Sequence, residues 1–259
     1  MGYSNSLTGS PKLNAAGPPV AFGKVIEIMK THSEDLRSGV VTFLDVLGWK
    51  GVYDRKLDAI GSLTLLIEGA RKEAGRRKRG RTMRDVEVKS ISDTIAIFTF
   101  AADKEVSDVI EVHGEICQWL IQESIEAELP IRGAIAFGEF QIRDNIFVGK
   151  GIDEAASWHE QSDWIGVNLT PSAEFVFKPK PSSRTWLPYE PPLKTRLKWK
   201  THCVNWTSDW KDRASHEAAI KAKFLRLGPI VPEIAGKLTN TLAFVKAAES
   251  SIVGPNASV

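Results

Sequence analysis

The chain lacks most of the features that mark secreted, membrane-spanning and zinc-binding proteins. Its 259 residues include only two cysteines, Cys117 and Cys203, which are too few and too far apart for a disulfide framework or a cysteine-based zinc site. No stretch approaches the roughly 18 consecutive apolar residues that span a bilayer, and the polar N-terminus lacks the apolar centre of a signal peptide. These absences predict a soluble protein of the reducing cytoplasm, with no membrane partner.

An excess of charge of one sign is also missing. The formal net charge is +2, which is too small to indicate a nucleic-acid partner by itself. A basic run extends over Arg71–Arg84, "RKEAGRRKRGRTMR", but it has no interleaved aromatic residues on which bases could stack. We expect a solvated loop there, with electrostatic steering of a triphosphate as the alternative. The five histidines show no His-x-x-x-His spacing, so they do not indicate a transition-metal site.

The chain does have enough apolar sequence for one domain with extensions, since 42% of its residues are hydrophobic. We expect residues 1–21 to be a flexible arm, 22–206 to form the domain and 207–259 to be a helical extension packed on it. Apolar spacing predicts the following elements: a short helix Phe22–His32, a strand Val40–Leu44, a helix from about Tyr53 to Lys72, a hairpin Val86–Phe100, a helix Glu105–Glu128, a strand pair around Ile131–Val148, a helix near Asp153–Gln161, a strand ribbon Leu193–Trp206, and helices Asp209–Leu227 and Pro232–Ser250. This order contains the β-α-β-β-α-β succession of a ferredoxin-like α+β core.

Two aspartates stand where the apolar alternation of a strand breaks. Asp45 follows Val40–Leu44, and Asp93 lies inside Val86–Phe100. Two carboxylates that project from buried strands can hold Mg²⁺ when a nucleoside triphosphate supplies the remaining ligands. The segment "VVTFLDVLGWKGVYDR" turns at Gly48 toward a helix beginning near Val52, and free backbone N–H groups at such a turn favour an anion. The alternative for Asp45 alone is an ordinary strand-to-helix turn that it caps.

These segments resemble motifs of the class III nucleotidyl cyclases. "FLDVLGWK" resembles the motif in which the first metal aspartate ends a strand, and "VKSISDTIAIF" resembles the hairpin with a base-contacting lysine, here Lys89, four residues before the second metal aspartate, Asp93. "LPIRGAIAFGEF" and "FVGKGIDEAASWHEQ" resemble the strand and helix that follow. The resemblance covers about Gly39–Trp206 and is closest to the bacterial pyrimidine cyclases of the Pycsar antiphage system. It implies a ferredoxin-like class III catalytic domain with C-terminal helices.

The resemblance also implies site residues and a partner. Asp45, Asp93 and the Val46 carbonyl would hold two divalent ions, Mn²⁺ or Mg²⁺. Trp49 would stack on the base, although an aromatic packed on the following helix is the alternative, and Tyr53 is a second candidate for a base contact. The late strand in "LKWKTHCVNW" carries a triphosphate lysine in the family, which corresponds to Lys198 or Lys200; alternating lysines also guard edge strands. Class III sites form between two chains, which implies a homodimer with groups near Asp153 supplied by the second chain.

Two departures from the purine cyclases concern chemistry and base selection. Asp153 and Ser157 stand where those enzymes have an asparagine and a transition-state arginine, so we name Arg132 and Arg143 as substitutes, with a structural role for Arg132 as the alternative. Ile146, three residues before Gly149, occupies the adenine-reading position without a polar group.

Lys89 can donate to the O4 atom of uracil but cannot accept from the amine of cytosine. We therefore predict conversion of UTP to cyclic UMP for a separate cyclic-nucleotide effector in antiphage defence, with CTP second. A cytidylate cyclase, a catalytically silent nucleotide-binding regulator, and a nucleic-acid-binding protein on the same fold remain the alternatives; the last is opposed by the low net charge.

Overall fold

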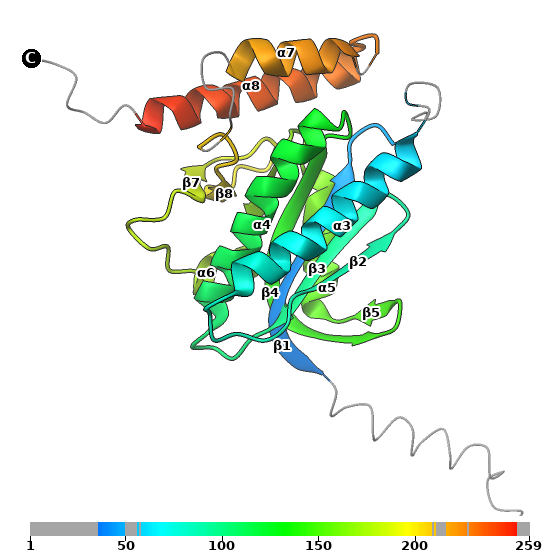
Figure 1. The fold of residues 1–259 in the computed structure, drawn as a ribbon. Coiled ribbons are helices and arrows are strands. Elements are labelled where there is room, and N and C mark those ends of the chain that lie inside the picture. The colour runs from blue at the N-terminus through cyan, green and yellow to red at the C-terminus, as the bar shows by residue number, and fades with distance from the viewer. Residues whose placement is uncertain are drawn as a thin grey trace, which may run out of the picture. The chain divides into compact units, whose positions relative to one another are not determined.

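The protein is built around one mixed sheet flanked by helices (Figure 1). The computed structural model describes residues 36–49, 56, 58–208, 210, 216–226 and 228–252. The predicted N-terminal arm, the predicted helix Phe22–His32 and Tyr53 lie outside the described residues. Among the described helices, none has the length and hydropathy that crossing a bilayer requires.

The described sheet contains eight strands in the order β2-β3-β1-β4-β6-β8-β7, with β5 paired to β4. In chain order the strands are β1 (Arg37–Val46), β2 (Glu87–Ile91), β3 (Thr94–Phe100), β4 (Ile131–Arg143), β5 (Ile146–Val148), β6 (Gly166–Leu169), β7 (Trp186–Tyr189) and β8 (Thr201–Val204). The helices are α3 (Ala59–Lys78), α4 (Val106–Glu126), α5 (Lys150–Gln161), α6 (Pro171–Val176), α7 (His216–Arg226) and α8 (Pro232–Ile252).

The first six described elements along the chain confirm the predicted ferredoxin-like α+β core. β1, α3, β2, β3, α4 and β4 follow one another in the order β-α-β-β-α-β. Their strands lie side by side as β2-β3-β1-β4, with antiparallel neighbours. Helices cover both faces of the sheet at β1, which explains why Val40–Leu44 is a continuous apolar run apart from Thr42.

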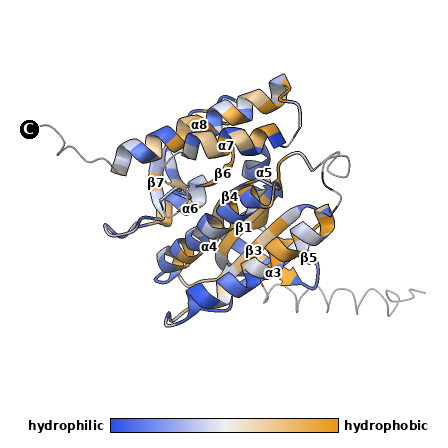
Figure 2. Cartoon of the chain, turned by 45° about the horizontal axis from the view of Figure 1, so that its top comes forward, coloured by the Kyte–Doolittle hydropathy of each residue, from blue (hydrophilic) through white to orange (hydrophobic). Residues whose placement is uncertain are grey.

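Each face of the sheet has its own cluster of buried side chains. α3 and α4 cover one face, where Leu44 of β1 packs with residues such as Ile67 and Ile110. α5 covers the other face, where Val41 and Phe43 of β1 pack against Ile152 and Ala155 of α5. Figure 2 shows the hydrophobic colouring of the central strands β1 and β3. Since side chains alternate along a strand, Asp45 lies on the same face as Phe43, beside α5.

A close contact between two backbones fixes the N-terminal end of α5. A Cβ atom on Gly138 of β4 would lie 2.9 Å from the backbone nitrogen of Gly151 in α5. Gly149, which precedes the helix, has a φ of 136°, a conformation that residues with a side chain rarely adopt. The two elements therefore approach as closely as their main chains allow.

The C-terminal helices contribute to the main apolar core. Ile220 and Phe224 of α7 and Phe244 of α8 are buried in it. The ring of Phe244 contacts Trp164, with 4.6 Å between the ring centroids. Figure 1 shows α7 and α8 lying side by side at one end of the sheet.

Several predicted boundaries were wrong. The helix predicted to end at Lys72 continues to Lys78, and the helix predicted from Asp153 begins at Lys150. The ribbon predicted over Leu193–Trp206 is a strand only at Thr201–Val204, which pairs with the unpredicted strand β7. The cause is tertiary packing: the Trp199 ring contacts Trp158 of α5 at 6.3 Å and Phe175 of α6 at 6.1 Å between centroids, instead of lying in the sheet.

A buried histidine joins α4 to the sheet. His113 is fully buried, and its ring nitrogens lie 2.7 Å from Oγ1 of Thr42 in β1 and 3.0 Å from Oγ1 of Thr99 in β3. Burial lowers the pKa of His113 to about 3. The imidazole is therefore neutral in the folded protein near neutral pH.

We predict that His113 makes folding stability fall as the pH is lowered. An unfolded histidine binds a proton below a pH of about 6.5, whereas the folded protein resists protonation down to about 3, so stability is complete above 6.5 and declines below it. The slope should reach up to about 1.4 kcal/mol per pH unit. Urea unfolding of the parent and of His113→Gln between pH 8 and pH 4 measures it. Parallel profiles for the two proteins would contradict the prediction.

Candidate active site

Asp45 lies one residue before the end of β1, in the middle of the sheet. It is paired in register with Thr94 of β3 on one side and with Arg132 of β4 on the other. Nη2 and Nε of Arg132 donate to Oδ2 of Asp45 at 2.9 and 3.2 Å. The side chains of both residues are largely buried, with exposures of 19% for Asp45 and 12% for Arg132. The first predicted metal ligand is therefore held in an ion pair inside the fold.

Asp93 lies in the tight turn between β2 and β3, next to the strand partner of Asp45. Ser92 makes this turn with a φ of 55°, and Asp93 is half-buried. Burial is the largest influence on the pKa of Asp45 and raises it; the hydrogen bond and the charge of Arg132 lower it, and the charge of Asp93 raises it further. The sheet thus brings the two aspartates close enough for their charges to interact.

Arg132 is held from a second side by the segment that follows α5. Its Nη1 atom donates to the carbonyl oxygen of Ser162 at 2.7 Å and to that of Glu160 at 3.4 Å. Two fixed carbonyls and one carboxylate leave the guanidinium little freedom. Both sequence interpretations of Arg132 are therefore compatible with its position: it buttresses the fold and also lies directly at the candidate site.

Lys194 was missed by the sequence analysis but belongs to the same group of charges. Lys194 is exposed; desolvation lowers the pKa of its ammonium, as do the nearby charges of Arg132 and Lys237, whereas Asp163 and Asp45 raise it. Its backbone N–H donates to the carbonyl of Gln161 at 2.9 Å. We call Arg132, Lys194 and Lys237 the cation cluster. No sequence pattern identified Lys194, because its proximity to Asp45 depends on this long-range backbone pairing.

Two residues that the sequence connects with base recognition, Lys89 and Ile146, lie near the tip of the β4–β5 hairpin. Lys89 pairs with Ala96, which pairs with Phe43, so Lys89 shares the α5 face with Asp45. The β4–β5 hairpin folds back over this face, and Lys89 Nζ donates to the carbonyl oxygen of Asp144 at its tip, at 2.7 Å. Ile146 begins β5 at that tip and is 68% exposed.

Arg143 ends β4 at the same hairpin tip, paired with Ile146. It is thus adjacent to the carbonyl that Lys89 contacts, at the opposite end of β4 from Arg132. Of the two arginines proposed from the sequence, the structure brings Arg132 to Asp45 and leaves Arg143 at the Lys89 end.

The residues after Asp45 pack inward. Val46 is buried, and Trp49 is partly buried against the main apolar core, which is the packing alternative given for this tryptophan. Gly48 has a φ of 74°, as expected for a turn.

Asp153, expected to act on a second chain, and the triphosphate-lysine candidates Lys198 and Lys200 all lie on the surface. Asp153 is exposed in the first turn of α5, and Ser157 Oγ donates to the Asp153 carbonyl at 2.8 Å. Lys198 and Lys200 are exposed and flank Trp199 in the irregular segment before β8. They are not on an edge strand, so the alternative that these lysines protect an edge strand was wrong.

The basic run was also interpreted wrongly as a solvated loop. Most of it is the C-terminal part of α3, where Arg76 and Arg77 both bond to the buried Glu73. Arg81, which follows the helix, pairs with Glu115. The end of the run lines a surface hollow with Arg37 and Phe100. Arg37 begins β1, whereas Asp45 lies at the far end of that strand, so this position does not favour steering of a triphosphate to Asp45.

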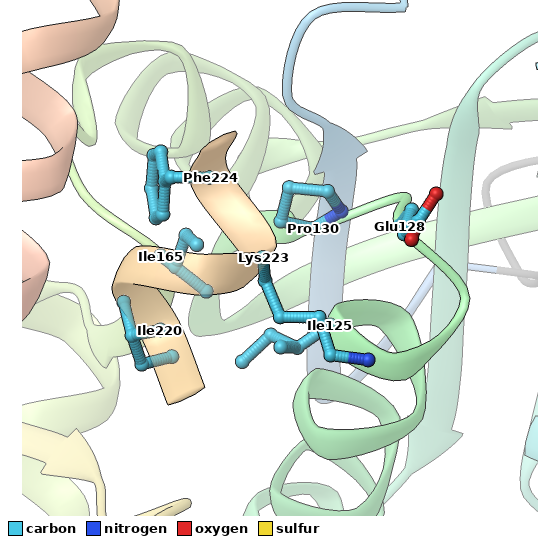
Figure 3. A pocket seen from close by; sticks show the side chains of 7 residues that line it. All are labelled: Ile125, Glu128, Pro130, Ile165, Ile220, Lys223 and Phe224. Atoms are coloured by element: carbon cyan, nitrogen blue, oxygen red, sulfur yellow. The ribbon is translucent and has the colours of Figure 1, made fainter. Parts of the chain in front are cut away.

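A small cavity lies on the other side of the sheet, between α4, α7 and the start of β4 (Figure 3). It is lined by residues that include Ile125, Pro130, Ile220 and Phe224. Its volume of about 10 Å³ is room for about one water molecule. It cannot accept a nucleotide.

The pair Asp45 and Asp93 fits a divalent cation bound together with a substrate. Both groups offer hard carboxylate oxygens, and their mutual repulsion is the kind that a cation relieves. Within the part of the chain that the structure describes, no group of three or more His, Cys, Asp or Glu side chains could complete a site. Further ligands would then come from backbone, water and phosphate oxygens, which is common for Mg²⁺.

Comparison with known proteins gives structural likeness only. No protein-family model and no curated protein matches the sequence. Solved structures that resemble it include the catalytic core of a rhodopsin-guanylyl cyclase with converted specificity in complex with ATPαS (19% identity, TM-score 0.44, covering 65% of this chain and 94% of that one). An adenylate/guanylate cyclase/hydrolase from Silicibacter pomeroyi is similar at 17% identity and a TM-score of 0.44, over 65% of this chain and 95% of that one. A class III adenylyl cyclase-like ATP-binding protein from Pseudomonas aeruginosa is similar at 10% identity and a TM-score of 0.38, over 55% of this chain and 35% of that one. Likeness at these identities and scores assigns no function to this chain.

Proposed function

We propose that the chain is a nucleotidyl cyclase of class III type that converts a pyrimidine ribonucleoside triphosphate, UTP by preference, to its 3′,5′-cyclic monophosphate and pyrophosphate. The observation that carries the proposal is the meeting of Asp45 and Asp93, from sequence motifs far apart, on the face of the sheet that also presents Lys89. A nucleotide needs metal ligands for its phosphates and a separate contact for its base. Asp45 and Asp93 would supply the first and Lys89 the second, on one face of the sheet.

In this proposal Asp45 and Asp93, with the Val46 carbonyl, hold two divalent ions, Mn²⁺ or Mg²⁺. When bound, the ions supply charge neutralisation at the phosphates and lower the pKa of the ribose 3′-hydroxyl. The 3′-hydroxyl gives its proton to water, and the 3′-oxygen forms the new bond to the α-phosphorus as the bond to pyrophosphate breaks. The protein itself makes no covalent bond, so its residues act by positioning and electrostatic stabilisation. Arg132, bonded to Asp45 and to the Ser162 carbonyl, is the proposed stabiliser of the charge that would develop in the transition state.

The second half of the site is proposed to come from another copy of the chain. Asp153 and the lysines Lys198 and Lys200 are exposed and are available to a partner's nucleotide. A homodimer with shared sites is the proposed working form. Tyr53 is retained as a proposed base contact, whereas Trp49 is not, because it packs against the main apolar core. The product is proposed to act on a separate cyclic-nucleotide effector in antiphage defence within the cytoplasm.

The choice between uracil and cytosine depends on the group at Lys89. Its ammonium can donate to O4 of uracil. The Asp144 carbonyl, 2.7 Å from Lys89 Nζ, is an acceptor that suits the exocyclic amine of cytosine. This observation favours cytidylate cyclase as the second candidate. Ile146 offers no polar group at the same tip, which disfavours adenine by the usual pattern.

A competition assay tests the function and the base preference together. We expect cyclic UMP to dominate when the four ribonucleoside triphosphates are supplied at equal concentration with Mn²⁺, and Lys89→Glu to reduce the share of cyclic UMP. Chromatography of the products measures both. A dominant cyclic CMP peak would overturn the uracil preference and keep the cyclase; a dominant cyclic AMP peak would overturn the pyrimidine proposal. No cyclic product from any triphosphate would favour the silent nucleotide-binding regulator.

A further inference from the structure

The basic run leaves an excess of positive charge where α3 ends. The segment Arg71–Glu87 has eight arginines and lysines and three acids. Together with Arg37 and three neighbouring acids, Glu68, Glu111 and Glu115, this makes nine cations against six acids. The surplus of three exceeds the net charge of +2 of the whole chain. The low net charge therefore conceals a local concentration of positive charge.

Three cations of the run face solvent without an acidic partner. Within the described part of the chain, Lys72, Arg79 and Arg84 are exposed and form no ion pair. Lys72 and Arg79 are seven residues apart, so they lie on one side of α3. Gly75 lies between them, and a Cβ atom there would meet nothing within 4 Å. Stabilisation of a helix C-terminus by basic residues does not account for Arg84, which lies beyond the helix end at Lys78.

A stacked column beside these cations ends in an exposed guanidinium. The Phe100 ring stacks on Phe140 with 4.6 Å between the ring centroids and an interplanar angle of 15°. The guanidinium of Arg37 lies 3.8 Å from the centroid of Phe100, and Arg37 is exposed. A guanidinium held in this way can stack a nucleobase on its other side. The column supplies the aromatic contact that the basic run lacks in the sequence.

One hollow connects the column with the basic run. It has a volume of about 420 Å³ and is lined by residues that include Arg37, Phe100 and Arg84. Sites for small ligands have volumes of about 300–1,000 Å³. The two acids that also line the hollow are each paired with a lysine, in Lys78–Asp85 and Lys89–Glu87. The hollow therefore suits a planar group that carries a phosphate, such as one nucleotide of a strand.

We propose that Lys72, Arg79, Arg84 and Arg37, here called the basic surface, bind a single-stranded nucleic acid. The first three contact phosphates, and an unpaired base stacks on the guanidinium of Arg37 in the hollow. The bases of a duplex stack on each other and an anionic membrane has none, so neither would use the stacked column. Arg37 and Asp45 lie at opposite ends of β1. The basic surface is therefore separate from the candidate active site, and the inference does not depend on the cyclase reaction.

Binding of a labelled oligouridylate of about 12 nucleotides to the full chain, followed by fluorescence anisotropy, tests the proposal. We expect the affinity to fall between about 50 and 200 mM salt, because each neutralised phosphate releases counterions. Three phosphate contacts predict a slope of about −2 in a plot of log K against log salt concentration.

Two variants separate the charge from the stacking contact. Arg84→Gln removes one phosphate contact and should weaken binding about tenfold and reduce the salt slope by about 0.7. Arg37→Lys keeps the charge but lacks the stacking plane, so it should weaken binding about tenfold at an unchanged salt slope. Lys221→Gln, an exposed cation on α7, should match the parent, because α7 lies at the other end of the sheet from the start of β1 (Figure 1). Arg132→Met, which changes the candidate active site, should also match it.

Gly75 offers a test in which no cation is removed. Gly75→Glu places an opposing charge between Lys72 and Arg79 and should weaken binding about fivefold, the effect of one charge contact in water. Gly75→Gln has a similar shape without the charge and should match the parent. Both should unfold at the parent's temperature or above, because the side chain has open space.

Unchanged affinity in Arg84→Gln, or equal losses in Gly75→Glu and Gly75→Gln, would overturn the basic surface. Unchanged affinity in Arg37→Lys would refute the stacking contact. Weaker binding in Arg132→Met would place the strand in the candidate active site and overturn the proposal. Tighter binding of a duplex of the same length, or of vesicles of anionic phospholipid, would contradict the single-strand assignment.

Discussion

Asp93→Ala should lower turnover by at least ~10³-fold and leave the fold intact, because charge stabilisation by a bound metal contributes several kcal/mol to the transition state. Asp93 lies in a turn and contributes little packing. The measurement is product formation at saturating Mn²⁺, with thermal unfolding as the test of the fold. Asp103→Ala, an exposed aspartate, should retain the parent's activity.

The same loss is expected at Asp45, but the structure shows that the substitution must be chosen with care. Alanine at this position would leave the largely buried Arg132 without its carboxylate, and an unpaired buried charge is itself destabilising. Asp45→Asn keeps an oxygen for Arg132 and removes the charge that holds a cation. Turnover within tenfold of the parent in either Asp45→Asn or Asp93→Ala would rule out the two-aspartate mechanism.

Arg132→Met should have opposite effects on metal binding and on turnover. The guanidinium occupies Oδ2 of Asp45 and repels any cation that approaches, so its removal should tighten Mn²⁺ binding to the nucleotide-free protein about tenfold, a difference of about 1.4 kcal/mol. Turnover should nevertheless fall about 10²- to 10³-fold, the usual effect of removing one group that stabilises transition-state charge.

Titration of Mn²⁺ at pH 8, followed by electron paramagnetic resonance, measures the first effect. Arg143→Met is the control, because Arg143 lies at the other end of β4 and should leave Mn²⁺ affinity unchanged. Unaltered Mn²⁺ affinity together with full turnover in Arg132→Met would assign this arginine a purely structural role.

The core of the fold was predictable because it depends on local patterns. The apolar runs of β1 and β3 and the helical stripe of α4 occur in the sequence as they do in the structure. The two aspartates were found for the same reason, since each interrupts such a run. Their proximity then follows from the β1–β3 register, in which Asp45 pairs with the neighbour of Asp93.

The errors arose where long-range contacts decide the outcome. "LKWKTHCVNW" alternates like a strand, but Trp199 packs between α5 and α6 instead. The basic run continues a helix because arginine and lysine are good helix formers and because Glu73 and Glu115 pair with its charges. Lys194 could not be singled out, since the bridge between Ser162 and Leu193 that places it has no local signal.

The bare contact between Gly138 and Gly151 has a consequence at the other end of α5. A side chain at Gly138 would push the first turn of the helix away from β4, because it would meet the Gly151 backbone at 2.9 Å. A helix of 12 residues tilts as a rigid rod, so the displacement reaches its last turn, where the Glu160 carbonyl faces Arg132. The position of the Arg132 guanidinium therefore depends on the backbone contact between these two glycines.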